Sequence, residues 1–314
     1  AGIPCNTLIN EPTAAILSCA ATKPVQGKVL VFDLGGGTFD ATLAEVEGED
    51  VKVLTSQGDL DLGGRIFDLE ILLLANEAFR TQFGEPLFNE TRAQLEDPNS
   101  LSFRSHQREA EAIKKDLSGR KSSARSFIRT NDNKSLMVTI TREQFEDKIA
   151  PYLGKAWIAI GVAMEDVGLT AADIDHVLLV GGSVRIPAFQ EGLAKMFGHG
   201  KIMTAPSVDE AVCLGAALRA ALEADDQMLN SLQRSTLENK SLTDVTNRYY
   251  GTLTINAESG QLMNSIILRK DTPLPCSATE SFYTISHGQT EVECKIAESS
   301  WEEKDPDLVQ LKAT

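Results

Sequence analysis

A glycine turn flanked by carboxylates is the segment of this sequence whose residue types are best suited to chemistry. Asp33 and Asp40 enclose residues 34–39, which contain three consecutive glycines followed by Thr38. Because no side chains obstruct such a bend, its backbone N–H groups can surround an anion, and phosphate is the obvious candidate. The Thr38 hydroxyl would add a donor, and the two aspartates suit a hydrated Mg²⁺ that bridges to a phosphate. A glycine-rich hairpin that holds no ligand is the alternative.

A second glycine turn follows the apolar run at residues 177–180. Gly181 and Gly182 come directly after this run, and Pro187 is suited to the first turn of a helix. A strand that turns into a helix presents N–H groups and the positive end of the helix dipole to a ligand. Arg185 lies within the turn, and its planar guanidinium group can lie against a nucleobase. An ordinary surface arginine is the alternative.

Together, the two turns indicate a nucleotide held between structural layers. Neither turn is followed by the Gly-Lys-Ser/Thr of a Walker phosphate loop, and neither has the Gly-x-Gly-x-x-Gly spacing of dinucleotide folds. The two turns therefore point to another class of nucleotide site. A further glycine pair, Gly63 and Gly64, carries no such indication by itself.

The composition disfavours several kinds of binding partner and indicates a cellular compartment. The chain of 314 residues carries a formal net charge of -15, and it has no block of lysines and arginines that could bind nucleic acid or an anionic membrane. No apolar run approaches the roughly 18 residues of a membrane span. The five cysteines are scattered without a close pair, which favours free thiols in a reducing compartment and predicts a cytoplasmic protein.

Apolar periodicity predicts alternating strands and helices up to residue 222. Strands are predicted at residues 29–32, 41–46, 51–55 and 177–180, with the second and third forming a hairpin. Helices are predicted at residues 65–79 and 104–117, with an irregular or partly helical stretch between them. Thr141 and Gln144 have the spacing of a capping box, which opens a helix running towards Val167.

The composition changes after residue 222. Residues 223–246 are polar and are interpreted as a linker, whereas residues 247–314 alternate in short runs and predict a β-rich module. The alternating runs lie at residues 253–255, 266–268, 282–284 and 292–296. Before the linker, an apolar stripe predicts a helix that faces a core, with the residues Ala211, Leu214, Leu218 and Leu222.

Five motifs occur in an order that carries a family resemblance. They are Asn10-Glu11-Pro12-Thr13-Ala14-Ala15, the glycine turn from Phe32 to Asp40, Leu62-Gly63-Gly64 with Phe67-Asp68, Val180 to Ser183 with Arg185-Ile186-Pro187, and Asp209-Glu210-Ala211-Val212 with Gly215-Ala216-Ala217. In this order they resemble the heat-shock protein 70 family of DnaK-like chaperones. The resemblance implies an α/β fold, namely the second lobe of an actin-like (ribonuclease H-like) ATPase domain followed by a β-rich partial sandwich.

The resemblance also implies a division of the chain and a function. Residues 1–222 correspond to the C-terminal portion of the nucleotide-binding domain, residues 223–246 to the linker and residues 247–314 to the start of the peptide-binding sandwich. The implied activity is that of an ATP-dependent folding chaperone that binds extended hydrophobic client peptides under nucleotide control. Its implied cofactors are ATP or ADP and Mg²⁺, and its implied partners include a J-domain cochaperone and a nucleotide exchange factor.

The family motifs imply roles for individual residues. Asp33 and Glu11 would contact Mg²⁺ through water, Asp40 would help to position the attacking water, and the catalytic set is completed by Thr38. The loop around the β- and γ-phosphates would comprise Gly35, Gly36, Gly37 and Thr38. Adenosine would contact two groups of residues. On one helix these are Glu111, Lys114, Lys115 and Ser118. On the opposite face they are Gly182, Ser183, Arg185 and Asp209.

The sequence also departs from the family pattern. The family has an earlier phosphate loop and a catalytic lysine upstream of the Asn-Glu-Pro-Thr motif, whereas nine residues precede that motif here. We therefore expect negligible ATPase activity from the chain alone, because one wall of a cleft cannot align ATP for attack. Lys115 stands where the family commonly has an arginine that stacks on adenine, so a lower adenine affinity is expected. Leu242 is the one leucine kept where the family linker is leucine-rich, which weakens the expectation of interdomain signalling.

Peptide binding and two other functions complete the expectations. Ile285 and Val292 fall where the family has an arch residue over the peptide and a central hydrophobic pocket, although ordinary core positions of a β-sheet are the alternative. A non-catalytic binding or regulatory module that keeps half of the ATPase fold is the second hypothesis for the whole chain. An actin-like sugar kinase is disfavoured because the β-rich C-terminal module has no place in it.

Overall fold

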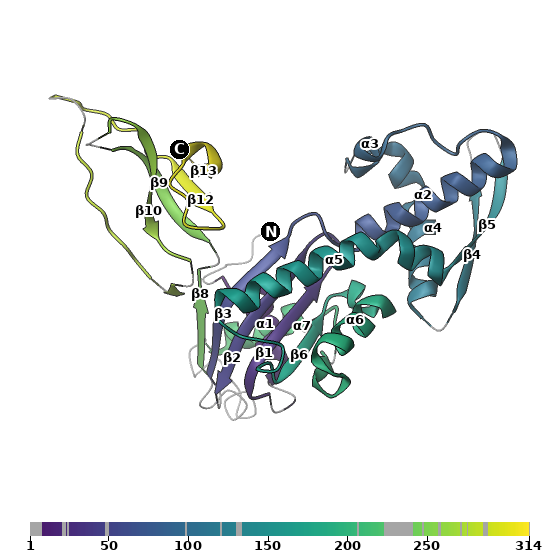
Figure 1. Ribbon diagram of the computed structural model, residues 1–314, viewed down its shortest axis with the longest axis horizontal. Coiled ribbons are helices and arrows are strands. Elements are labelled where there is room, and N and C mark those ends of the chain that lie inside the picture. Colours follow the sequence, from purple (N-terminus) through teal and green to yellow (C-terminus); the bar gives the residue numbers. More distant parts are fainter. Residues whose placement is uncertain are drawn as a thin grey trace.

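The structure is a computed structural model with three parts, and a base lies between a tip and a β module (Figure 1). It describes residues 8–20, 23, 25–47, 50–97, 99–119, 121–129, 134–205, 207–222, 241–246, 248–256, 259–270, 272–274, 276–284 and 288–313. The base is a seven-stranded sheet with helices on both faces. The tip is the helical and hairpin unit of residues 64–141, and the β module is the four-stranded sheet of residues 249–313.

The base sheet is built around a buried central strand. Its strand order is β11-β8-β3-β2-β1-β6-β7. The strands are β1 (Gly27–Leu34), β2 (Phe39–Glu47), β3 (Asp50–Asp59), β6 (His176–Val180), β7 (Ile202–Thr204), β8 (Ser241–Val245) and β11 (Pro273–Leu274). Strand β1 pairs antiparallel with β2 and parallel with β6, and its last six residues are buried, as expected for an apolar run covered on both faces. The four strands predicted in this region are confirmed, the hairpin included.

Helices cover both faces of the base sheet. Helix α5 (Arg142–Asp166) crosses one face, and α1 (Glu11–Ala20) and α7 (Ala211–Leu222) lie on the other (Figure 1). Helix α6 (Pro187–Phe197) follows β6 and begins at a proline, as predicted. The capping box of α5 is also confirmed. The Thr141 hydroxyl accepts from the Gln144 N–H at 3.2 Å, and the Thr141 N–H donates to Gln144 Oε1 at 2.9 Å.

The apolar stripe predicted for α7 is wrong in one respect. Leu214 is 46% exposed, and the buried residues of this helix are Ala211 and Gly215. A Cβ atom on Gly215 would lie 1.8 Å from the carbonyl oxygen of Ala14 on α1, so the two helices approach at backbone distance. Small residues make this contact, because leucine side chains would hold the helices apart.

An aromatic cluster supports the first glycine turn. Phe32 of β1 packs on Phe39 of β2 and on Phe189 of α6, with ring centroids 4.8 and 5.9 Å apart. Phe67 of α2 and Trp157 of α5 pack on Phe189 at 5.6 and 6.0 Å. Since Phe32 and Phe39 flank the turn, this cluster fixes both of its ends.

In its described residues, the tip contains three helices and a hairpin. These are α2 (Gly64–Phe83), α3 (Arg92–Glu96), α4 (Leu101–Ser118), β4 (Ser123–Arg129) and β5 (Ser135–Thr141). Helices α2 and α4 confirm the two predicted helices. Helix α3 lies in the stretch that was expected to be irregular or partly helical, and it begins with a capping box formed by Thr91 and Gln94. The β4–β5 hairpin lies outside every predicted element.

The base sheet extends into the range interpreted as a linker. Strand β8 pairs in parallel with β3, with Ser241 opposite Asp50, and β11 pairs with β8. Lys270 is 6% exposed and forms an ion pair of 3.1 Å with Asp166, the last residue of α5. Asp166 also accepts a hydrogen bond from Gln57 Nε2 at 2.7 Å. The segments that lead into and out of the first hairpin of the β module are therefore both attached to the base.

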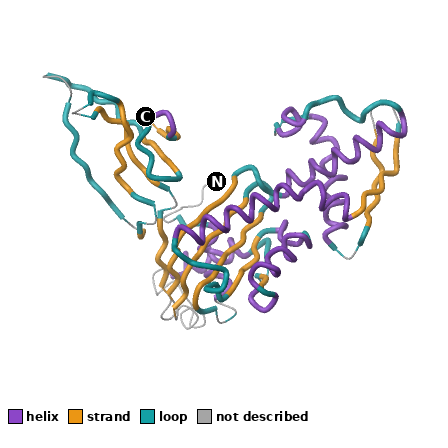
Figure 2. Tube along the Cα trace, in the orientation of Figure 1, coloured by secondary structure: helices purple, strands orange, loops and turns teal. Residues whose placement is uncertain are grey.

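The β module is a single four-stranded sheet in the order β10-β9-β12-β13. Its strands are β9 (Tyr249–Ile255), β10 (Leu262–Leu268), β12 (Ile296–Ser299) and β13 (Gln310–Ala313). The strands predicted around residues 253–255 and 266–268 are confirmed. The strand predicted at residues 282–284 is wrong, and so is the first part of the one at 292–296, because residues 276–284 and 288–295 form a loop along the outer side (Figure 2). Alternation produces a strand only where a neighbouring backbone is available to pair.

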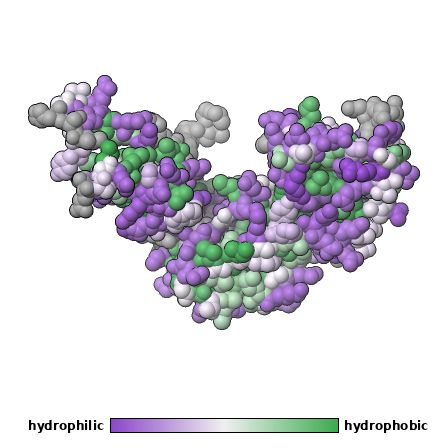
Figure 3. Space-filling model, turned by 45° about the horizontal axis from the view of Figure 1, so that its top comes forward, coloured by the Kyte–Doolittle hydropathy of each residue, from purple (hydrophilic) through white to green (hydrophobic). Residues whose placement is uncertain are grey.

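Polar side chains predominate on the surface, with hydrophobic patches on the base and the β module (Figure 3). On the strands of the β module, four aliphatic side chains are each 44–51% exposed, namely Ile255, Leu262, Ile296 and Leu311. Within the described part of the chain, no helix combines the length and the apolar character needed to cross a membrane.

Candidate functional site

Three glycine turns interlock where the tip meets the base. The turn at the start of α2 donates its Gly64 N–H to the Gly35 carbonyl at 2.9 Å and its Arg65 N–H to the Gly36 carbonyl at 2.7 Å. From the turn after β6, the Ser183 hydroxyl donates to the same Gly35 carbonyl at 2.8 Å. The turn between β1 and β2 is therefore held from two sides.

Close backbone approach explains why two of these positions are glycine. Gly181 has a φ of 84°, and a Cβ atom there would lie 2.4 Å from the Leu34 carbonyl oxygen. A Cβ atom on Gly63 would lie 2.6 Å from the backbone of Gly37. A side chain at either position would push the turns apart. Gly63, to which the sequence alone gave no role, is thus part of the same assembly.

A cavity of about 840 Å³ opens between these turns and helix α4. Its base side is lined by Gly35, Gly36, Gly182, Ser183, Arg185, Ile186 and Asp209. Its tip side is lined by Gly64, Arg65, Asp68, Gln107, Glu111, Lys114, Lys115, Ser118 and Gly119. A cavity of this size can hold a small organic ligand, for which roughly 300–1,000 Å³ is usual. Of the residues predicted to contact nucleotide, Gly37 and Thr38 do not line it.

Helix α4 holds a braced ammonium group at the edge of the cavity. Lys114 is 11% exposed, forms an ion pair of 2.8 Å with Asp68 and donates to the Gly64 carbonyl at 3.0 Å. Burial raises the pKa of Asp68 to about 6, although the neighbouring Lys114 opposes that rise. The Ser118 hydroxyl donates to the Lys114 carbonyl at 2.8 Å, within the same helix. Lys114 therefore links α4 to the start of α2.

Two exposed ion pairs face the cavity from opposite sides. On α4, Lys115 Nζ lies 2.8 Å from Glu111, one helical turn earlier, and the Lys115 side chain is 71% exposed. On the base, Arg185 donates two hydrogen bonds to Asp209, at 3.1 and 2.7 Å. Because this pair is bidentate, it fixes the plane of the guanidinium group. One side of the cavity thus presents an exposed ammonium group and the other a fixed planar cation.

Three carboxylates gather at the base of the first glycine turn. Asp33 and Asp40 are opposite each other in the β1–β2 register, and Glu11 at the start of α1 lines a cavity of about 170 Å³ together with Asp40. Burial raises the pKa of Asp33 to about 6, and the charges of Glu11 and Asp40 add to the rise. The pKa of Asp40 is also raised, first by burial and then by Glu11.

Among the described residues, no group of three carboxylate, histidine or cysteine side chains could ligate a metal ion directly, so a divalent cation at this carboxylate cluster would be held through its water ligands. The donors of the cluster are carboxylate oxygens, which hard cations such as Mg²⁺ prefer, and their mutual repulsion is what a double positive charge would offset. Asp33 and Asp40 stand at the two ends of the glycine turn. A cation held there would therefore lie next to a phosphate bound in the turn.

The two predicted peptide-binding residues lie in the β module. Val292 is in a loop and is 65% exposed, so the alternative of an ordinary sheet-core position is wrong for this residue. Ile285 falls outside the described residues. The peptide-binding roles of both residues stay predictions.

Two further residues that belong to none of the family motifs line the cavity. Gln107 lines it one helical turn before Glu111, so the spacing on α4 could have indicated it. Arg65 lines it as well, with its guanidinium group 4.8 Å above the Phe103 ring. The place of Arg65 depends on a tertiary contact between α2 and α4, for which no local sequence signal exists.

Comparison with known proteins identifies a family. The family model described as "Hsp70 protein" matches residues 1–310. "Heat shock 70 kDa protein 6, chloroplastic" of Arabidopsis thaliana is 34% identical over 304 residues, which are 96% of this chain and 39% of the relative. "Stromal 70 kDa heat shock-related protein, chloroplastic" of Spinacia oleracea is 35% identical over 306 residues, which are 96% of this chain and 47% of the relative. The chain therefore spans less than half the length of these relatives.

The comparisons correct one expectation and support another. Both relatives are chloroplast proteins, so the expectation of a cytoplasmic protein is wrong, and the relatives point to a plastid instead. The cytoplasmic expectation was drawn from the scattered cysteines. Free cysteines indicate reducing conditions, but they do not identify the compartment. The match over residues 1–310 agrees with the order of the motifs, whose glycine turns meet at one cavity. The chain belongs to the Hsp70 family.

Proposed function

We propose that the cavity binds an adenine nucleotide and that the chain forms the nucleotide-controlled part of an Hsp70-type chaperone. The observation that carries this proposal is the convergence of distant family motifs and helix α4 on one cavity of about 840 Å³. The strand order β3-β2-β1-β6-β7, in which β2 alone is antiparallel to its neighbours, supports an actin-like lobe of the ribonuclease H-like kind.

The adenosine part of the ligand lies between the tip and the base. Arg185 offers the face of a guanidinium group that Asp209 already holds in place, and a nucleobase can stack on such a face. On the opposite side, Glu111 and Lys115 present an acceptor and a donor suited to ribose hydroxyls. The ligand thus contacts the fixed guanidinium group of Arg185 on one face and the exposed side chains of Glu111 and Lys115 on the other.

The phosphates lie over the first glycine turn. Gly36 and Gly37 are exposed, and a Cβ atom at either position would meet nothing within 4 Å, so an anion can approach this backbone closely. When bound, Mg²⁺ would supply the positive charge that holds phosphate oxygens beside the carboxylates. Asp33 and Glu11 would bind its water ligands, and Asp40 would orient a further water.

Nucleotide control of the β module would act through the attachments between β8, Lys270 and the base. Strand β8 pairs with β3, whose far end pairs with the start of β2 next to the glycine turn, so the turn and the linker share one sheet. Lys270 adds a nearly buried ion pair to Asp166. Extended client peptides would bind at the β module, where Val292 is accessible.

Calorimetric titration of the 314-residue chain with ADP and Mg²⁺ tests the proposal. Saturable binding is expected, and Arg185→Ala is expected to weaken it about tenfold, the loss of one stacked cation of ~1.4 kcal/mol. Lys121→Ala is the control, because it removes an exposed ion pair with Asp116 outside the cavity. Absence of saturable binding, or equal losses in both variants, would refute the proposed site.

A further inference from the structure

We propose that α3, through Arg92, braces the neck between the tip and the base and thereby sets the width of the nucleotide cavity. The neck is the region where α2 and α5 pass each other between these two parts (Figure 1). The effect on nucleotide affinity rests on the proposed function, whereas the mechanical role of the brace does not. Arg92 is in this sense a positioning residue.

The position of the neck explains why its geometry matters for the cavity. Chain continuity joins the tip to the base through α2 on one side and α5 on the other. The cavity is lined by α4 of the tip and by the glycine turns of the base. Rotation at the neck would therefore move Lys115 relative to Arg185 and change the space between them.

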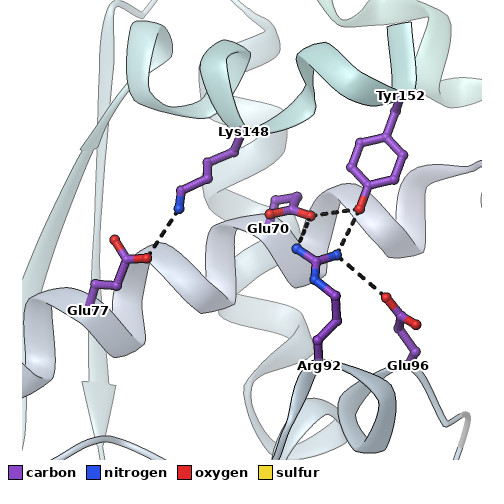
Figure 4. A network of polar contacts seen from close by, with 6 residues as sticks. All are labelled: Glu70, Glu77, Arg92, Glu96, Lys148 and Tyr152. Atoms are coloured by element: carbon purple, nitrogen blue, oxygen red, sulfur yellow. Dashed lines mark hydrogen bonds and ion pairs between the residues drawn. The ribbon is translucent and has the colours of Figure 1, made fainter. Parts of the chain in front are cut away.

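Three side chains from three helices form a closed triangle at the neck (Figure 4). Arg92 of α3 lies 2.5 Å from Glu70 of α2 and donates to the Tyr152 hydroxyl of α5 at 2.8 Å. The Tyr152 hydroxyl in turn donates to the same Glu70 oxygen at 2.7 Å. Glu70 has a side chain that is 2% exposed, so its charge depends on these partners. Burial and the bond to Glu70 raise the pKa of Tyr152 to about 12, so the phenol remains a protonated donor even in alkaline solution.

Helix α3 is attached to the rest of the tip by a buried side chain and a hydrogen bond. Leu95 is fully buried in a small core of its own, with Leu69, Leu72, Phe88 and Phe103. The carbonyl of Leu95 also accepts a hydrogen bond of 3.4 Å from Arg65, whose N–H holds the Gly36 carbonyl of the first glycine turn. The brace is thus connected to the phosphate end of the cavity through one residue.

The neck is hollow beside this triangle. Cavities of about 500 and 490 Å³ lie there, and both are lined by Tyr152 and Lys155. Apolar side chains of α2 and α5, among them Phe67 and Ile149, pack in the main core, and the polar triangle adds a second connection on the side of the neck where these cavities lie. A second contact between α2 and α5, Lys148 to Glu77 at 3.1 Å, has side chains that are 38% and 65% exposed. Exposed pairs contribute little, so this pair serves as a matched control.

Distances between spin labels test the brace without nucleotide. Labels are placed on cysteines introduced at Thr139 of the tip and Lys195 of α6, with the other cysteines replaced by serine. Arg92→Met and Tyr152→Phe are expected to broaden or shift the distance distribution, whereas Lys148→Met is expected to leave it unchanged. Tyr152→Phe keeps the aromatic ring, whose centroid lies 6.0 Å from that of Phe67. This variant is therefore expected to fold, and it tests the brace even if Arg92→Met does not fold. Identical distributions in wild type and in folded Tyr152→Phe would overturn the proposal.

Nucleotide titration of the same variants, without labels, tests the link to the cavity. The dissociation constant for Mg²⁺-ADP is expected to rise about tenfold in Arg92→Met and to stay constant in Lys148→Met. A widened distance distribution with unchanged affinity would overturn the link between neck and cavity. If wild type itself binds no ADP, the proposed function fails, and the distance distributions alone decide whether Arg92 braces the neck.

Discussion

Neutralising Asp33 is expected to stabilise the nucleotide-free chain at neutral pH. Asp33 is buried beside Glu11 and Asp40, and burial, followed by those two charges, raises its pKa from 3.8 to about 6. Above pH 6, folding therefore requires an ionised carboxylate in a place that disfavours it. Asp33→Asn keeps the shape of the side chain but removes the charge.

The expected magnitude follows from the pKa. A rise from 3.8 to about 6 corresponds to about 3 kcal/mol at 1.36 kcal/mol per pKa unit. The folded chain binds this proton more tightly than the unfolded chain, so the stability it contributes is complete below pH 3.8 and is lost as the pH rises through 6. The amide side chain of the Asp33→Asn variant carries no such proton. The stability advantage of Asp33→Asn is therefore greatest at pH 7.5 and shrinks by about 1.4 kcal/mol at pH 5.

Urea denaturation of both proteins between pH 5 and 8 measures this difference. Acidic groups common to both proteins largely cancel in the comparison. Asp61→Asn is the control, because it removes a carboxylate from an exposed position near the same turn. If the difference between wild type and Asp33→Asn is the same at pH 5 and pH 7.5, the argument from burial is refuted.

Three further changes probe the turns, the linker and the adenine site. Gly181→Ala is expected to cost about 2 kcal/mol or more in urea denaturation, because Gly181 has positive φ and contacts a carbonyl, whereas Gly36→Ala, with open space around it, is expected to be nearly neutral. Lys270→Met is expected to leave Asp166 without its ammonium partner and to speed proteolysis between base and β module, and an unchanged cleavage rate would contradict this. Lys115→Arg is expected to tighten Mg²⁺-ADP binding about threefold to tenfold in calorimetry by adding a stacking face, and equal affinity would show that no stacking occurs.

Local signals predicted the elements that carry the glycine turns. The run before Asp33 was apolar enough to indicate a buried strand, and the capping box at Thr141 marked the start of α5. These features depend on residues close together in the chain. The apolar stripe of α7 predicted the wrong buried side for Leu214. The side that packs is set by the close approach of Gly215 to Ala14, which is distant in sequence, and not by hydrophobicity.

Long-range contacts account for what could not be predicted. Glu70 meets Arg92 across 22 positions and Tyr152 across 82 positions, and no periodicity relates residues so far apart. The family resemblance implied most of the residues that line the cavity. It did not indicate Arg65, which reaches the cavity because Phe103 and the Leu95 carbonyl hold its side chain.

The same burial that makes Asp33 costly in the empty chain makes it effective with a cation. A divalent ion bound through water to Asp33 and Glu11 needs the ionised carboxylates, so binding must release the protons that burial retains. Mg²⁺ affinity in the presence of ADP is therefore expected to fall as the pH drops through 6, the direction opposite to stability. Asp68, on the far side of the cavity, has the same effect on ligand binding. Its pKa is also raised to about 6, and its ionised form is what fixes Lys114. The ionised carboxylates beside the glycine turns thus lower the stability of the nucleotide-free chain and favour ligand binding.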